Sequence, residues 1–68
     1  MNRDYSNAEV CRIIDDYIHS ERDRAILKRR LIDGIGFEAV AEEFEMSERQ
    51  VKTIVYKGRE KIFSKMRK

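Results

Sequence analysis

The stretch FEAVAEEFEMSERQVKTIVY, residues 37–56, contains two runs of apolar residues at helical spacing, and the residues EMS interrupt the spacing between them. Ser47, with Gln50 three residues later, forms a capping box, which is typical of the first turn of a new helix. Met46, just before this cap, is placed to pack on Val51 as a hydrophobic staple. The stretch therefore predicts two helices joined by a short turn, the first acidic and the second basic.

Similar signals place the ends of the other helices. Ser6 with Glu9 and Ser20 with Asp23 are N-cap pairs, and apolar residues repeat every three or four positions after each pair. Gly34 is suited to the left-handed conformation that ends a helix. The absence of proline and of strand-like runs between turn residues also favours helices. The sequence predicts an all-α fold of four helices, at about residues 7–19, 21–33, 37–44 and 48–65.

Length and composition limit the class of protein. Sixty-eight residues suffice for a single domain, residues 1–68, with a small core. Charged and hydrophobic residues each make up 41% of the chain, so it is apolar enough to fold. No apolar run reaches the length of a membrane span and no signal peptide is recognisable, so we expect a cytoplasmic protein with no membrane partner.

Residues suited to catalysis or metal binding are scarce. Cys11 and His19 are each the single residue of their kind, so no cluster has metal-ligand spacing, and we expect neither a metal nor another cofactor. Adjacent carboxylates such as Asp15 and Asp16 point about 100° apart on a helix and do not easily share one substrate atom. The sequence contains no Ser, His and carboxylate set and no phosphate-binding glycine loop. We therefore expect no enzymatic activity.

The charges are divided unevenly along the chain. Residues 49–68 carry eight Lys and Arg side chains and one Glu, a net charge of +7. Residues 1–48 carry seven basic and twelve acidic side chains, a net charge of −5. A basic segment of this kind favours a polyanionic partner, although a solvated helix face is the simpler explanation of charge alone.

A helix-turn-helix motif requires a small residue where its two helices cross, apolar residues on both helices and a short turn. Ala41 is the small residue in this chain. Apolar residues occupy the five positions that such a motif buries, namely Val40, Phe44, Met46, Val51 and Ile54. The pattern predicts that the helices at residues 37–44 and 48–65 form a helix-turn-helix.

Residues 20–63, SERDRAILKRRLIDGIGFEAVAEEFEMSERQVKTIVYKGREKIF, resemble region 4 of bacterial sigma factors, which reads the minus-35 promoter element. The resemblance lies in the helix stop at Asp33 and Gly34, in the segments FEAVAEEF and MSERQVK, and in the basic segment KGREKI that follows them. The DNA-binding output domains of response regulators share part of this pattern and are the alternative family.

The chain departs from the sigma-factor pattern in two respects. Glu45 occupies a turn position where the family commonly has glycine, and a left-handed backbone there costs a glutamate about 1 kcal/mol. No segment that could melt a promoter or clamp the polymerase precedes the region-4-like part, so we expect that the chain does not act as a sigma factor by itself.

The apolar residues of the predicted last helix fall on one side, which turns its other side toward solvent. The inward set is Val51, Ile54, Val55, Gly58 and Ile62. The outward set is Glu48, Arg49, Lys52, Thr53, Tyr56 and Lys57. Because the major groove of DNA admits one α-helix, the outward set is the candidate for contact with base edges.

The resemblance implies base contacts at four of these positions, Glu48, Arg49, Lys52 and Thr53. Arginine can form a bidentate pair with guanine, and glutamate can accept a hydrogen bond from cytosine. Lys57 and Arg59 are assigned to the phosphate backbone. Tyr56 completes the candidate DNA-binding set, with packing on a neighbouring helix as its alternative role.

Two other charged groups bear on this interface. Lys28, Arg29 and Arg30 form a basic cluster that could touch an adjacent phosphate if it faces the same side as the last helix. The third helix and its turn carry the acidic residues Glu38, Glu42, Glu43 and Glu45. These carboxylates either orient the DNA reader by repelling phosphates or serve as a solubilising face.

The sequence thus predicts a small transcriptional regulator that binds double-stranded DNA sequence-specifically, with helix 48–65 in the major groove. The alternative is a protein-interaction module that docks on RNA polymerase or another regulator, as sigma region 4 docks on the polymerase flap. Ile62, Phe63 and Met66 could extend the apolar stripe into a homodimer contact, so a monomer and a homodimer are both left open.

Overall fold

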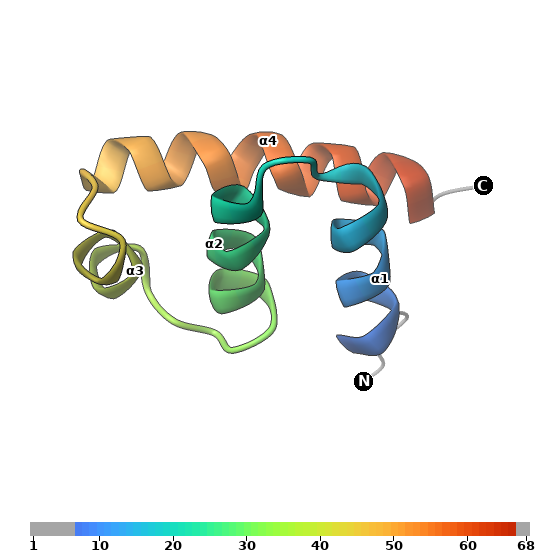
Figure 1. Ribbon diagram of the computed structural model, residues 1–68, viewed down its shortest axis with the longest axis horizontal. Helices are drawn as coiled ribbons and strands as arrows, with labels where there is room; N and C mark the ends of the chain where they lie inside the picture. Colours follow the sequence, from blue (N-terminus) through green and yellow to red (C-terminus); the bar gives the residue numbers. More distant parts are fainter. Residues whose placement is uncertain (1–6, 67–68) are drawn as a thin grey trace.

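Four helices make up the regular structure of the computed structural model, which describes residues 7–66. They are α1 (Asn7–Tyr17), α2 (Glu21–Leu31), α3 (Phe37–Glu43) and α4 (Glu48–Met66). No strand occurs in this described part, and the predicted all-α fold is confirmed. The long helix α4 extends along one side of the molecule, and α3, α2 and α1 lie in that order along it, from its N-terminal to its C-terminal end (Figure 1).

Two of the predicted N-caps are confirmed in detail. The Ser20 hydroxyl accepts a hydrogen bond from the backbone N–H of Asp23 at 3.3 Å, at the start of α2. At the start of α4, the Ser47 hydroxyl accepts from the N–H of Gln50 at 3.1 Å, and the Gln50 side chain accepts from the N–H of Ser47, also at 3.1 Å. Both halves of this capping box are therefore formed. The predicted pair that begins with Ser6 lies outside the described residues.

Helix α1 ends at Tyr17, two residues before the predicted end at position 19. The carbonyls of Ile18 and His19 accept hydrogen bonds from Nη1 of Arg24 at 2.8 and 3.1 Å. This long-range cap satisfies carbonyl groups that the end of a helix leaves without a backbone partner. The prediction missed it because Arg24 belongs to the next helix.

Helix α2 ends at Leu31, also two residues earlier than predicted. The backbone N–H groups of Ile32 and Asp33 both donate to the carbonyl of Lys28, at 2.9 and 3.2 Å, so the last turn widens before the chain leaves the helix. Gly34 follows with a φ of 73°, the left-handed conformation that was predicted for it. The other two helices begin where predicted and end within one residue of the predicted position.

Nine buried hydrophobic side chains form the core, and each helix contributes two or three of them. They are Ile13, Ile14, Ile26, Leu27, Val40, Ala41, Val51, Val55 and Ile62. The set predicted to be buried between α3 and α4 lies in or against this core, with Val40, Ala41 and Val51 buried and Phe44, Met46 and Ile54 packed against them.

The turn between α3 and α4 has the geometry of a Schellman motif. The N–H of Met46 donates to the carbonyl of Ala41 at 2.8 Å, and the N–H of Glu45 donates to the carbonyl of Glu42 at 3.3 Å. Glu45 has a φ of 56°, and it is the single non-glycine residue with positive φ between residues 7 and 66. A glutamate therefore occupies the left-handed position that usually carries glycine, as the sequence led us to expect.

Helices α2 and α4 cross at Gly58, which is buried. A Cβ atom at this position would lie 2.6 Å from both Cδ atoms of Leu27, closer than carbon atoms can approach without displacement. Leu27 is itself a core residue, 1% exposed, so a Cβ atom at position 58 would force either Leu27 or α4 to shift. Gly58 therefore lets the two helices approach more closely than any larger residue would.

We predict that Gly58→Ala destabilises the protein even though alanine is the better helix former. Overpacking costs about 1–3 kcal/mol and the gain in helix propensity is about 1 kcal/mol, so the free energy of unfolding should fall by about 1 kcal/mol. Urea unfolding followed by circular dichroism measures this. In a Leu27→Ala background the space is free, and the same substitution should become neutral or stabilising. Stabilisation in the wild-type background would contradict the close crossing.

We predict that Glu45→Gly is more stable than Glu45→Ala by about 1 kcal/mol, because glycine adopts the left-handed conformation without the steric cost that a Cβ atom brings. The alanine variant is the matched control, since both substitutions remove the carboxylate. Glu45→Val should be the least stable of the three because of its branched Cβ. Equal urea midpoints for all three variants would show that the turn does not hold this conformation.

Candidate nucleic-acid interface

The predicted inward and outward sides of α4 are separated as expected. Val51, Val55, Gly58 and Ile62 are buried, and Ile54 is half-buried against the core. All seven candidate DNA-binding residues are exposed: Glu48, Arg49, Lys52, Thr53, Tyr56, Lys57 and Arg59. None of them is part of the buried core, so their side chains are available to a partner.

The exposed residues of α4 form three rows rather than one patch, because successive residues are rotated by about 100°. Arg49, Thr53 and Tyr56 follow the middle of the outward side. Lys52 and Arg59, seven residues apart, lie on the side of the helix that faces Phe37. Lys57 lies on the opposite side of the middle row, four residues before Lys61.

An aromatic cluster forms on the side of α4 that carries Lys52 and Arg59. The rings of Phe37 and Tyr56 meet edge to face, with 5.9 Å between their centroids. The guanidinium carbon of Arg30 lies 4.4 Å from the centroid of Phe37, and Nζ of Lys52 lies 5.7 Å from it. Tyr56 nevertheless remains 53% exposed, so it both packs on a neighbouring element and faces solvent. Packing on a neighbouring helix and contact with DNA are therefore compatible roles for Tyr56.

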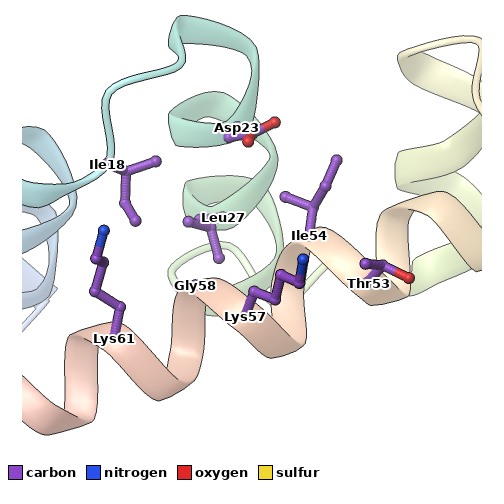
Figure 2. Close-up of a pocket in the computed structure, with 8 residues that line it drawn as sticks. All are labelled: Ile18, Asp23, Leu27, Thr53, Ile54, Lys57, Gly58 and Lys61. Carbon is purple, nitrogen blue, oxygen red and sulfur yellow. The ribbon is translucent and has the colours of Figure 1, made fainter.

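A shallow groove of about 410 Å³ runs along the other side of α4 (Figure 2). Leu27 and Gly58 lie at its middle, between Ile18 and Ile54, and Asp23 of α2 also lines it. Lys61 reaches toward Ile18 and Lys57 toward Ile54. The sequence interpretation did not include Lys61, which lies one turn beyond Lys57. Gly58 lines the groove at the point where α2 and α4 cross.

Arg22 is a second cation that the sequence interpretation did not assign to the interface. It lies in the first turn of α2, yet it lines one hollow together with Met46, Arg49 and Gln50 at the beginning of α4. Its side chain is 58% exposed and its Nε lies 3.5 Å from the carboxylate of Asp23. No local pattern could have identified it, because Arg22 and Arg49 meet only through the packing of α2 on α4.

The basic cluster on α2 is engaged within the protein. Lys28 pairs with Asp15 of α1 at 2.8 Å. Arg29 pairs with Asp33 at 2.9 Å and with Glu43 of α3 at 3.1 Å, and its hydrogen bonds to these two carboxylates raise the pKa of the guanidinium above its usual value. These exposed ion pairs contribute little stability individually, but they occupy two of the three cations.

The carboxylates of α3 and its turn are exposed. Glu43 is the member of this group that pairs with Arg29, whereas Glu38, Glu42 and Glu45 face solvent. None of these carboxylates forms an ion pair with a cation of α4 among residues 7–66.

Other kinds of site were also sought in the described part of the chain. Residues 7–66 contain no group of three His, Cys, Asp or Glu side chains placed to hold a metal ion. Cys11 is half-buried and forms no disulfide. No helix within residues 7–66 is both long and apolar enough to cross a membrane.

None of the protein-family models, curated proteins and solved structures with which the chain was compared matches it. The pattern of the sequence and the geometry of its surfaces are therefore the basis for any functional proposal.

Proposed function

We propose that the protein is a small transcriptional regulator that binds double-stranded DNA sequence-specifically, with α3, its turn and α4 as a helix-turn-helix. The observation that carries the proposal is the outward side of α4, where Arg49, Lys52 and Lys57 are exposed and none forms an ion pair with a carboxylate among residues 7–66. Cations without carboxylate partners are suited to a polyanion.

The placement of α4 supports this role physically. The first turns of a helix in the major groove direct side chains at base edges, while cations on its two sides meet the phosphates. In α4, Arg49 and Thr53 lie in the middle row near the N-terminus, with Lys52 on one side and Lys57 on the other. Arg49 is thus assigned to guanine, and Lys57 and Arg59 to the backbone.

The resemblance of residues 20–63 to sigma region 4 adds independent support, because the family reads promoter DNA with the corresponding helix. The exposed position of Arg22 beside Arg49 extends the proposed surface to the beginning of α2. A phosphate next to the base that Arg49 contacts would lie within its reach.

The most direct test is selection of bound sequences from a random duplex pool at moderate salt. An enriched motif would support DNA reading and would also reveal its symmetry. A two-fold motif with half-sites about one DNA turn apart indicates a homodimer, and a short asymmetric motif indicates a monomer. Capture of RNA polymerase by a protein that enriches no sequence would instead favour the protein-interaction module.

We predict a steep decrease of DNA affinity with salt concentration. The logarithm of the association constant should fall by about 0.9 for each phosphate contact per tenfold increase in salt, so several contacts give a slope of several units. Lys57→Ala should weaken binding to all sequences alike and reduce the slope by about one unit. Fluorescence anisotropy over a series of salt concentrations measures both quantities, and a flat salt response would contradict the proposal.

We predict that Arg49→Ala acts differently, by losing about 1–3 kcal/mol on the selected sequence and little on unrelated DNA. The matched control is Arg12→Ala, which removes an exposed arginine from α1, outside the proposed interface. The control should bind like the wild type. Equal losses for Arg49→Ala on selected and unrelated DNA would assign Arg49 to the backbone instead.

A further inference from the structure

Phe37 occupies a position that its sequence context did not mark as functional. It is the first residue of α3, directly after the N-cap Gly36, which has an extended backbone with φ −67° and ψ 160°. This cap directs the ring toward the place where α2, α3 and α4 meet. The ring is only half-buried, so it is not a member of the fully buried core.

Two cations from two other helices share this ring. Arg30 comes from α2, with its guanidinium carbon 4.4 Å from the ring centroid, and Lys52 comes from α4, with Nζ at 5.7 Å. The negative face of an aromatic ring attracts both charges. Arg30 is also held by a hydrogen bond from its Nη1 to the carbonyl of Ile35, at 3.3 Å.

No carboxylate of the described residues pairs with either cation. This differs from Lys28 and Arg29, the neighbours of Arg30 in sequence, which both have carboxylate partners. Two like charges at one ring repel each other, and the ring compensates both of them, with the Ile35 carbonyl as a further partner of Arg30 alone. An aromatic ring accepts no conventional hydrogen bond, so the N–H donors of Lys52 stay available to an anion.

We propose that Phe37 is a positioning residue for DNA binding, which holds Lys52 and Tyr56 in place on α4 and Arg30 beside them. This inference rests on the proposed function. Lysine loses much side-chain freedom when it is fixed on a phosphate or a base, and a contact that restricts it beforehand reduces that loss. The ring of Phe37 supplies this restriction to Lys52 and, through the edge-to-face contact, to Tyr56.

The test compares Phe37→Leu, which keeps an apolar side chain, with Phe37→Tyr, which keeps the ring. Binding to the sequence selected by the wild type is measured by anisotropy, and the thermal midpoint of each variant shows that it is folded at the assay temperature. Phe37→Leu should weaken binding about two- to five-fold for each cation that it releases, whereas Phe37→Tyr should bind within about two-fold of the wild type.

A double-mutant cycle with Lys52→Ala separates positioning from packing. If Phe37 acts through Lys52, the loss caused by Phe37→Leu should shrink by about two- to five-fold in the Lys52→Ala background. A loss of equal size in both backgrounds would show that the ring has only a structural role and would overturn the inference. In the same variants, nuclear magnetic resonance should show the Tyr56 ring protons shifting when the Phe37 ring is removed.

The outcomes distinguish this inference from the proposed function. If the wild type binds selected DNA and Phe37→Leu binds it equally well, the inference fails and the function stands. If the wild type enriches no DNA sequence and shows no salt-dependent binding, the proposed function fails and the inference fails with it.

Discussion

The close crossing of α2 and α4 at Gly58 is the contact on which the rest of the structure depends. These two helices contact each other, and each of them contacts both α1 and α3, whereas α1 and α3 do not contact each other within the described residues. A side chain at position 58 would push α4 away from Leu27 and so from the centre of this arrangement. Gly58 also lines the groove beside Lys57 and Lys61, so this crossing borders both the core and the surface next to it.

The division of charge follows from how the helices pack. The inward side of α4 is entirely apolar, so its cations face solvent or the groove beside α2, and none of Arg49, Lys52 and Lys57 pairs with a carboxylate among residues 7–66. Lys28 and Arg29 of α2 instead face α1 and α3, where Asp15 pairs with Lys28 and Glu43 pairs with Arg29. The net charge of +2 therefore conceals an excess of acidic residues in positions 1–48, with a net charge of −5, and an excess of basic residues in positions 49–68, with a net charge of +7.

Much of the fold was predictable from the sequence because its signals are local. Ser47 and Gln50 specify the start of α4, and the resemblance to a turn that commonly carries glycine indicated that Glu45 could have a positive φ. What the sequence could not supply was contact between residues distant along the chain. Gly58 was correctly placed on the inward side, yet its approach to Leu27 depends on the packing of two helices. The cap from Arg24, the position of Arg22 beside Arg49, and the sharing of the Phe37 ring by Arg30 and Lys52 arise in the same way.

The unpaired cations of α4 also affect the stability of the protein itself. Lys57, Lys61 and Lys65 succeed one another at four-residue intervals, and Arg49 and Lys52 are three residues apart, spacings at which like charges on a helix repel. A core of nine buried side chains leaves little stability in reserve against this repulsion. A bound polyanion would neutralise the charges, and because it would bind the folded helix rather than the unfolded chain, its binding would also stabilise the fold. The arrangement that makes α4 a candidate DNA reader is thus unfavourable for the isolated protein, and it is most easily understood if the charges normally have a partner.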